Sequence, residues 1–173
     1  MRLTIYTDYA LRVLMYLSVK YHEGGVATID EMAAAYGISR NHLTKIVNEL
    51  AQRGVIETVR GRAGGARLAR DPKQISIGEI VRIAEKDFSV VECHVAGSEP
   101  SCAIFQACNL KRGLRRAMDA FMQELDRMTL ADAVTQPSVA APLLGIEAAP
   151  RRAAIRIAPA RPAPGRRSAR GAA

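Results

Sequence analysis

Tryptophan is absent from this sequence, aromatic residues make up only 5% of it, and its apolar runs are short. A helix that crosses a membrane needs about 18 or more consecutive apolar residues, so the sequence predicts no membrane span. Asp8 and Arg12 interrupt the region where a signal peptide would carry its apolar core, and we therefore expect a cytoplasmic protein. The 173 residues are 49% hydrophobic, which is enough for one folded domain with or without an appendage.

Cysteine is also scarce. The three present are Cys93, Cys102 and Cys108, spaced C-x8-C-x5-C in a segment with no helical periodicity. In a reducing compartment, thiols serve metal or redox chemistry more often than structural bridges. Three thiolates in one loop favour an iron–sulfur cluster, zinc or copper(I), although inert or disulfide-forming cysteines have the same spacing. A cluster usually takes four ligands, so a fourth must lie elsewhere; a zinc site completed by His94 is the rival interpretation.

Acidic residues are few near the C-terminus. Residues 135–173 hold seven arginines and six of the eight prolines but one acidic residue, Glu147. Frequent proline blocks helices and sheet ladders, so we predict a disordered basic tail over 135–173. This tail carries most of the net charge of +8, and a second basic region, residues 40–73, has eight Lys and Arg against three acidic residues.

Hydrophobic periodicity and capping residues predict a mainly α-helical fold for residues 1–134. Residues 1–85 form the expected DNA-binding domain: a first helix capped by Thr7, a helix-turn-helix over about 28–53, and a β-hairpin wing over 55–69 with a glycine-rich tip. Residues 86–108 form the cysteine loop. Residues 109–134 read as a long helix.

Two short helices followed at once by a basic hairpin are typical of a winged helix-turn-helix, whose second helix enters the DNA major groove. The predicted DNA-contacting residues are Ser39, Arg40, Asn41, His42 and Lys45 on that helix, with Arg60, Arg62 and Arg67 on the wing. Arginine suits guanine, asparagine suits adenine, and basic wing residues suit phosphates or a narrow minor groove. The alternative is a helical hairpin whose charges are merely solvated.

The long helix carries an apolar stripe that includes Leu110, Leu114, Phe121 and Leu125. Such a stripe covers the domain's own core or joins two subunits. We favour a homodimer joined along residues 109–134, because two recognition helices would then read a palindromic operator.

Catalysis is not expected. His22, His42 and His94 lie in no triad signature, and Cys-x-x-Cys is absent. A zinc-binding structural adaptor remains an alternative to a DNA-binding regulator.

Five stretches carry a resemblance to a known family: Leu3–Arg12, Tyr36–Asn48, Val59–Gly65, Cys102–Leu110 and Thr129–Val134. Together they resemble the Rrf2 family of winged-helix regulators, and within it the nitric-oxide-sensitive repressors. The resemblance implies a cytoplasmic homodimer with one iron–sulfur cluster per subunit, 4Fe–4S rather than 2Fe–2S. Such a repressor binds operators of nitric-oxide detoxification genes until nitric oxide attacks the cluster.

The resemblance also implies ligands. These are Cys93, Cys102 and Cys108, with Asp8 of the partner subunit as the fourth. Asp8 has a second interpretation, since it can pair with Arg12 one helical turn away. The gap between the first two cysteines is longer than in several family members, and the arginine-rich tail is no family feature. An iron- or redox-responsive regulator of the same family is the alternative function.

Overall fold

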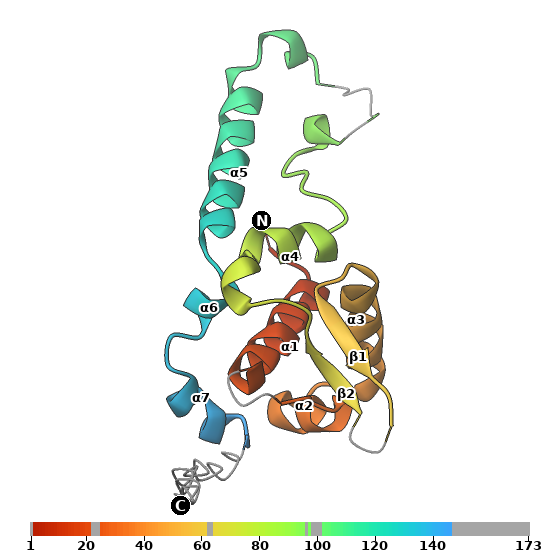
Figure 1. The fold of residues 1–173 in the computed structure, drawn as a ribbon. Helices are drawn as coiled ribbons and strands as arrows, with labels where there is room; N and C mark the ends of the chain where they lie inside the picture. The colour runs from red at the N-terminus through yellow and green to blue at the C-terminus, as the bar shows by residue number, and fades with distance from the viewer. Residues whose placement is uncertain (1, 22–24, 62–63, 96, 98–101, 147–173) are drawn as a thin grey trace, which may run out of the picture.

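The computed structural model describes residues 2–21, 25–61, 64–95, 97 and 102–146 (Figure 1). The elements in chain order, with η marking a 3-10 turn, are α1 (Ile5–Tyr21), α2 (Ile29–Tyr36), α3 (Arg40–Gln52), β1 (Ile56–Val59), β2 (Gly65–Leu68), η1 (Pro72–Gln74), α4 (Ile77–Ala84), η2 (Glu92–His94), η3 (Phe105–Ala107), α5 (Asn109–Arg127), α6 (Leu130–Ala133) and α7 (Pro137–Leu143).

The helix-turn-helix predicted over 28–53 is present as α2 and α3. Thr28 and Glu31 form a reciprocal capping box at the start of α2, so that two backbone N–H groups of the first turn find partners. Gly37 ends α2 with a left-handed φ of 64°, a conformation that costs glycine little. The Ser39 side chain then accepts from the His42 amide and starts α3. Local sequence alone therefore sets the turn between the two helices.

The first helix begins earlier than predicted. Thr4, not Thr7, caps it, because the Thr7 amide donates to Thr4 Oγ1 at 3.3 Å. Thr7 is instead a fully buried residue within the helix, and its hydroxyl faces the end of α4.

The wing is the antiparallel pair β1 and β2, in register from Ile56 opposite Leu68 to Val59 opposite Gly65. An isolated bridge between Ala27 and Ala66 joins β2 to the strand-like residues before α2. This bridge ties the wing to the start of the helix-turn-helix. The orientation of the wing relative to α3 is therefore fixed by backbone hydrogen bonds.

One apolar cluster holds these elements together, with α1 at its centre. Val13, Leu14 and Leu17 of α1 are buried, and they lie with Leu43, Ile46 and Leu50 of α3 in the same core. Burying such a side chain contributes about 1.5–3 kcal/mol, so this packing fixes α3 on α1. The outward face of α3 is left for solvent or a ligand.

The long helix is shorter than the predicted 109–134. α5 ends at Arg127, Met128 is extended, and Thr129 opens the separate helix α6 with its own capping box. At this break the Ile77 amide donates to Met128 O and the Leu130 amide donates to Ile75 O, both at 2.8 Å. These backbone bonds interrupt the helix and fasten the C-terminal end of α5 to the start of α4.

The disordered tail predicted over 135–173 is wrong for its first residues. Residues 137–143 form α7, which packs against α1, and both Ala141 and Ile146 are buried. Pro137 is tolerated because it stands in the first turn, where its missing N–H is not needed. The remainder of the predicted tail, residues 147–173, lies outside the described residues.

Candidate nucleic-acid interface and cysteine site

The first turns of α3 carry the predicted recognition residues on an exposed surface. Ser39, Arg40, Asn41, His42 and Lys45 are all exposed, whereas Leu43 and Ile46 of the same helix face the core. The polar and apolar faces of α3 are thus cleanly separated. A helix in this arrangement can insert its polar N-terminal half into a major groove without disturbing the core.

Three of these side chains, Ser39, Arg40 and His42, already have partners within the chain. Arg40 forms an exposed ion pair with Asp30 of α2, at 2.7 Å. His42 Nδ1 lies 3.1 Å from Ser39 Oγ, and the His42 ring lies 6.1 Å from the ring of Tyr9 in α1. Exposed pairs contribute little stability, so a nucleic acid can displace them at low cost.

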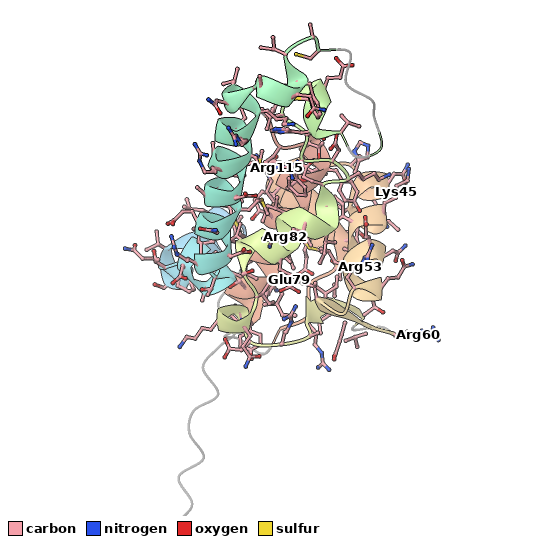
Figure 2. All side chains as sticks on the ribbon, turned by 90° about the horizontal axis from the view of Figure 1, so that it is seen from above. Lys45, Arg53, Arg60, Glu79, Arg82 and Arg115 are labelled. Atoms are coloured by element: carbon pink, nitrogen blue, oxygen red, sulfur yellow. The ribbon has the colours of Figure 1, made fainter. Side chains whose placement is uncertain are left out.

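The wing presents its basic residues differently. Arg60 is exposed at the end of β1, while Arg67 donates two hydrogen bonds to Glu57 across the hairpin, at 2.8 and 3.0 Å. The third predicted wing residue, Arg62, lies outside the described residues. Figure 2 shows Lys45, Arg53 and Arg60 projecting from one side of the molecule, away from Arg115 on α5.

The cysteines lie in the segment between α4 and α5. Cys102 is exposed, Cys93 and Cys108 are half-buried, and none forms a disulfide. Cys108 caps α5, its Sγ accepting from the Lys111 amide at 3.4 Å. His94 is engaged with the Lys111 carbonyl oxygen, at 3.0 Å.

Three free thiols fit a soft metal centre by donor chemistry. The three thiols do not lie close together in the structure. Among the described residues, no three His, Cys, Asp or Glu side chains are placed to hold a metal ion. For one chain to hold a cluster with these three thiols, the described residues that carry them would have to move closer together. His94 as a fourth zinc ligand would also have to leave Lys111.

Asp8 lies in the first turn of α1. Its Oδ2 accepts from Arg12 Nε at 2.9 Å, and its side chain is 49% exposed. The pairing with Arg12 expected from the spacing is thus present within one chain, and an exposed pair of this kind is easily broken.

The start of α1 is bonded to the residue that leads into the cysteine segment. Glu85 follows α4, and its Oε1 accepts from the Thr4 amide at 2.6 Å and from Thr7 Oγ1 at 2.5 Å. Burial works to raise the pKa of Glu85, but the bonds from Thr7 and Thr4 outweigh it and hold the pKa below its usual value. The ionised carboxylate thus stabilises the N-terminus of α1.

The same turn of α1 is bonded to the recognition helix. The Tyr6 hydroxyl donates a short hydrogen bond to Glu49 of α3. Burial and this carboxylate both raise the pKa of Tyr6, so the phenol remains a donor at neutral pH. The first turn of α1 therefore contacts the cysteine segment through Glu85 and α3 through Glu49.

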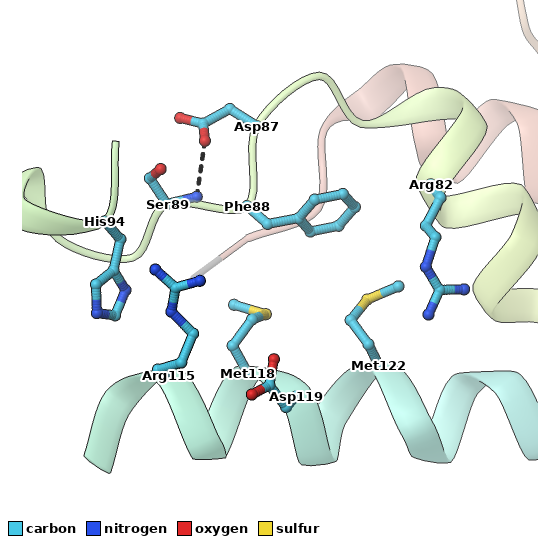
Figure 3. A pocket seen from close by; sticks show the side chains of 9 residues that line it. All are labelled: Arg82, Asp87, Phe88, Ser89, His94, Arg115, Met118, Asp119 and Met122. Carbon is cyan, nitrogen blue, oxygen red and sulfur yellow. Dashed lines mark hydrogen bonds between the residues drawn. The ribbon is translucent and has the colours of Figure 1, made fainter. Parts of the chain in front are cut away.

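A cavity of about 420 Å³ lies between residues 87–94 and α5. Met118 and Met122 lie along its α5 side with Arg115 and Asp119, and Phe88 and His94 approach from the facing segment (Figure 3). No cysteine lines it. Cys93 itself lies in η2, which contacts α5.

The sequence profile of the Rrf2 family, described as an iron-dependent transcriptional regulator, matches residues 3–136. This chain belongs to the Rrf2 family. Rrf2 proteins are transcriptional regulators and not enzymes, as the sequence predicts for this chain.

Comparisons with individual proteins show which regulators of the Rrf2 family this chain is similar to. The chain is 47% identical to the HTH-type transcriptional regulator NsrR of Bacillus subtilis over 134 residues. These aligned residues make up 78% of this chain and 90% of the relative. It is 49% identical over 133 residues to NsrR of Geobacillus kaustophilus, covering 76% and 88%. In structure it is similar to CymR, the global cysteine regulator of B. subtilis, with a TM-score of 0.63 and 29% identity over 78% of this chain and 97% of the other. It is thus an Rrf2 regulator similar to NsrR.

The winged-helix fold predicted from sequence is confirmed by the likeness to CymR, a winged-helix regulator of the Rrf2 family. Within the described ranges, no helix combines the length and hydropathy that a membrane crossing requires.

Sequence reasoning missed the three residues that join the parts of this Rrf2 chain. Tyr6, Glu49 and Glu85 are far apart in sequence; Tyr6 lies within the stretch Leu3–Arg12 that resembles the family, whereas Glu49 and Glu85 lie outside the five stretches. The available signals were weak: an acidic residue at the end of the domain predicted over 1–85, and a tyrosine beside Thr7, the predicted start of the first helix. Pairing them requires knowledge of how α1, α3 and α4 pack.

Proposed function

We propose that this Rrf2 protein is a homodimeric repressor that senses nitric oxide through an iron–sulfur cluster. In this proposal it binds palindromic operators of nitric-oxide detoxification genes in the cytoplasm and leaves them when nitric oxide reacts with the cluster. The observation that carries the proposal is the combination of an exposed recognition helix with three free thiols, in a chain 47% identical to NsrR.

The DNA-binding role rests on α3 and the wing. Asn41 and Arg40 are the residue types that read adenine and guanine, and Ser39, His42 and Lys45 suit phosphates or base edges. Arg60, Arg62 and Arg67 would contact the backbone beside the groove. Because Arg67 is already paired with Glu57, we assign it a smaller share of the binding than Arg60.

For the sensing role, Cys93, Cys102 and Cys108 would hold the cluster, with the partner subunit's Asp8 as the fourth ligand. We assign one 4Fe–4S cluster per subunit in preference to 2Fe–2S. When bound, the cluster supplies iron that reacts with nitric oxide. Asp8 would have to leave Arg12, which an exposed pair permits.

The chain itself can connect the cysteine segment with α3. Glu85 joins the base of that segment to Thr4 and Thr7, and Tyr6, in the same turn, is bonded to Glu49 of α3. A shift of residues 86–108 that moves Glu85 therefore displaces the first turn of α1 and, through Tyr6, the recognition helix. DNA affinity changes if the two arrangements of α3 fit the operator differently.

The dimer is assigned to α5. Leu110 is 69% exposed and Phe121 36% exposed, and with Leu114 they lie on one face at spacings of four and seven residues. A second copy of α5 would cover this face and place two recognition helices about one DNA turn apart. Phe121→Asp should therefore shift the protein from dimer to monomer in sedimentation without unfolding it.

The decisive experiment is anaerobic purification followed by titration with nitric oxide. The protein should show visible absorption that bleaches on titration, and the bleached form should bind a DNA site selected by the intact protein at least about tenfold more weakly. Cys102→Ser should lose the absorption, whereas Ile104→Ala, a neighbouring exposed residue, should keep it. Equal DNA affinity with and without the cluster would refute the sensing role.

One observation favours a second candidate. The matching family is described as iron-dependent, which suits an iron- or redox-responsive regulator. Absorption and DNA binding that respond to iron chelation or oxidant but not to nitric oxide would select it. Colourless protein with stoichiometric zinc would instead identify a zinc-binding adaptor.

A further inference from the structure

The cavity between residues 87–94 and α5 combines apolar surface with charged groups. Phe88, Met118 and Met122 supply the apolar part, and Met122 is buried. Sites that hold small molecules measure about 300–1,000 Å³ and combine apolar surface with a few convergent polar groups. At about 420 Å³ the cavity is of this kind. No cysteine and no residue of α3 lines it, so neither the sensing role nor the DNA-binding role uses it.

Three of the polar groups that line the cavity already have partners within the chain. Arg82 donates two hydrogen bonds to Asp126 of α5. The Asp87 carboxylate accepts from the Ser89 amide at 2.8 Å, as Figure 3 shows. The His94 ring is engaged with a backbone carbonyl oxygen of α5, at 3.0 Å. These three groups are therefore already occupied, at least in part.

Arg115 and Asp119 differ from these groups. Both line the cavity from α5, and within the part of the chain that the structure describes neither side chain forms a hydrogen bond or an ion pair. Figure 3 shows Arg115 extending from α5 towards Ser89 and His94, with Asp119 beside Met118. Residues four apart on a helix are neighbours on its surface. An unpaired positive group and an unpaired negative group thus lie side by side next to apolar surface.

This combination matches the chemistry of a free α-amino acid. Such a molecule carries a carboxylate, an ammonium group and a side chain on one carbon. A guanidinium such as that of Arg115 binds a carboxylate with two parallel hydrogen bonds. The Asp119 carboxylate accepts from an ammonium group, and methionine side chains adapt to apolar groups of different shape. An organic anion would leave Asp119 unpaired, and an organic cation would leave Arg115 unpaired.

We propose that this cavity binds a free α-amino acid with an apolar side chain. Arg115 holds its carboxylate and Asp119 its ammonium group, and the side chain lies against Phe88, Met118 and Met122. This binding does not depend on the proposed DNA-binding or sensing function.

The site is compatible with the dimer assigned to α5. Successive residues of a helix advance by about 100°, so Arg115 and Met122 lie on a different side of α5 from Leu110 and Phe121. A second subunit on the face that contains Leu110 and Phe121 therefore leaves this side of the helix open to a small molecule.

The ligand would connect two parts of the chain that carry cysteines. Residues 87–94 include Cys93 in η2, and Cys108 caps α5. A molecule that contacts both sides of the cavity would hold residues 87–94 on α5. Their amides should therefore exchange with solvent more slowly when the ligand is bound.

The test is calorimetric titration of the full-length protein with L-phenylalanine, L-methionine and L-leucine. At least one of the three should bind. Three further compounds each lack one feature: 3-phenylpropionate has no ammonium group, phenethylamine has no carboxylate, and glycine has no apolar side chain. Loss of either charge should weaken binding at least about tenfold relative to L-phenylalanine, and glycine should bind at least as weakly as these two.

Two variants locate the ligand. Arg115→Gln and Asp119→Asn should each weaken binding of the amino acid at least about tenfold. Asp119→Asn should leave the affinity for 3-phenylpropionate unchanged, because that compound has no ammonium group. The matched control is Arg116→Gln, which changes an exposed arginine of α5 outside the cavity lining and should keep the affinity of the natural chain. Thermal unfolding checks that the variants are folded.

Absence of binding by all three amino acids at about 10 mM would overturn the proposal. So would amino-acid binding that Arg115→Gln and Asp119→Asn leave unchanged, or binding without slower exchange of the amides of residues 87–94, since the ligand would then lie elsewhere. DNA plays no part in these measurements, so their failure leaves the proposed function standing.

Discussion

The DNA-binding region, α1 to α4, and the region from Glu85 to Arg127 differ in how much apolar surface the chain itself covers. The first contributes most of the buried core, including Leu14, Leu43, Ile46 and Ile80. In the second, within its described part, Met122 is the one buried core residue. The first region therefore buries most of its own large apolar side chains, whereas the described part of the second leaves most of its own at least partly exposed.

The largest expected effect comes from shortening one isoleucine in each region. Ile46→Ala should lower the free energy of unfolding by about 2–5 kcal/mol, because Ile46 is fully buried against α1. Ile104→Ala should change it by less than about 0.5 kcal/mol, since that side chain is 63% exposed. Urea unfolding followed by circular dichroism measures both. If the two variants lost similar amounts of unfolding free energy, the two regions would not differ in how well the chain buries their apolar side chains.

Two glycines give a second matched pair. At Gly65 a Cβ would collide with the Ala27 carbonyl oxygen and come within 2.7 Å of Val26 Cγ1, so Gly65→Ala should cost about 2 kcal/mol. At Gly113 of α5 a Cβ would meet nothing within 4 Å, so Gly113→Ala should stabilise the helix by about 0.5–1 kcal/mol. Unfolding measures the first and hydrogen exchange of α5 amides the second. A destabilising Gly113→Ala would reveal packing on that face.

Substitution of Glu85, at the junction of the two regions, should have the smallest effect on the free energy of unfolding. This effect should depend on pH. The hydrogen bonds from Thr7 and Thr4 hold the pKa of Glu85 below its unfolded value, so its contribution is present at neutral pH and is lost as the pH falls through the folded pKa. Glu85→Gln should cost about 1 kcal/mol at pH 7 and progressively less towards pH 3. Stability is measured by urea unfolding across this range.

Thr7→Val supplies the control for this carboxylate, because it removes one donor while keeping the buried volume. In the Thr7→Val background, Glu85→Gln should cost less than in the natural chain. If the free energy of unfolding changed with pH in the same way for the natural chain and for Glu85→Gln, the hydrogen bonds of Glu85 would add nothing to stability.

The sequence predicted those elements whose signals are local. The helix-turn-helix over 28–53 and the wing over 55–69 depend on capping residues, a turn glycine and strand alternation that act within a few residues, and both elements are present in the structure. The start of α1 was predicted at the wrong threonine, because Thr4 and Thr7 are both suitable caps. The distinction depends on Glu85, which lies 78 residues from Thr7.

The predictions for the end of α5 and for the residues of α7 were wrong for the same reason: both depend on contacts with residues far away in sequence. The apolar stripe of α5 continues to Met128, so periodicity gave no sign of the break that the bonds to Ile75 and Ile77 impose. Proline and alanine near residue 137 resembled the sequence that follows, although α7 is held by packing on α1. For the candidate site, residue types located the recognition helix and the thiols, but the contacts of Tyr6 and Glu85 depend on tertiary packing.

The backbone hydrogen bonds at Met128 and Leu130 anchor one end of α5, so a small rotation at that end displaces the other end by a larger distance. Its C-terminal end is fastened to α4 by these bonds and by the paired contacts of Arg82 with Asp126, at 2.5 and 2.7 Å. Its other end, about 28 Å away, carries Cys108. A tilt of about 10° at the fastened end would carry that thiol about 5 Å, so a small rotation of α5 against α4 becomes a large displacement of Cys108.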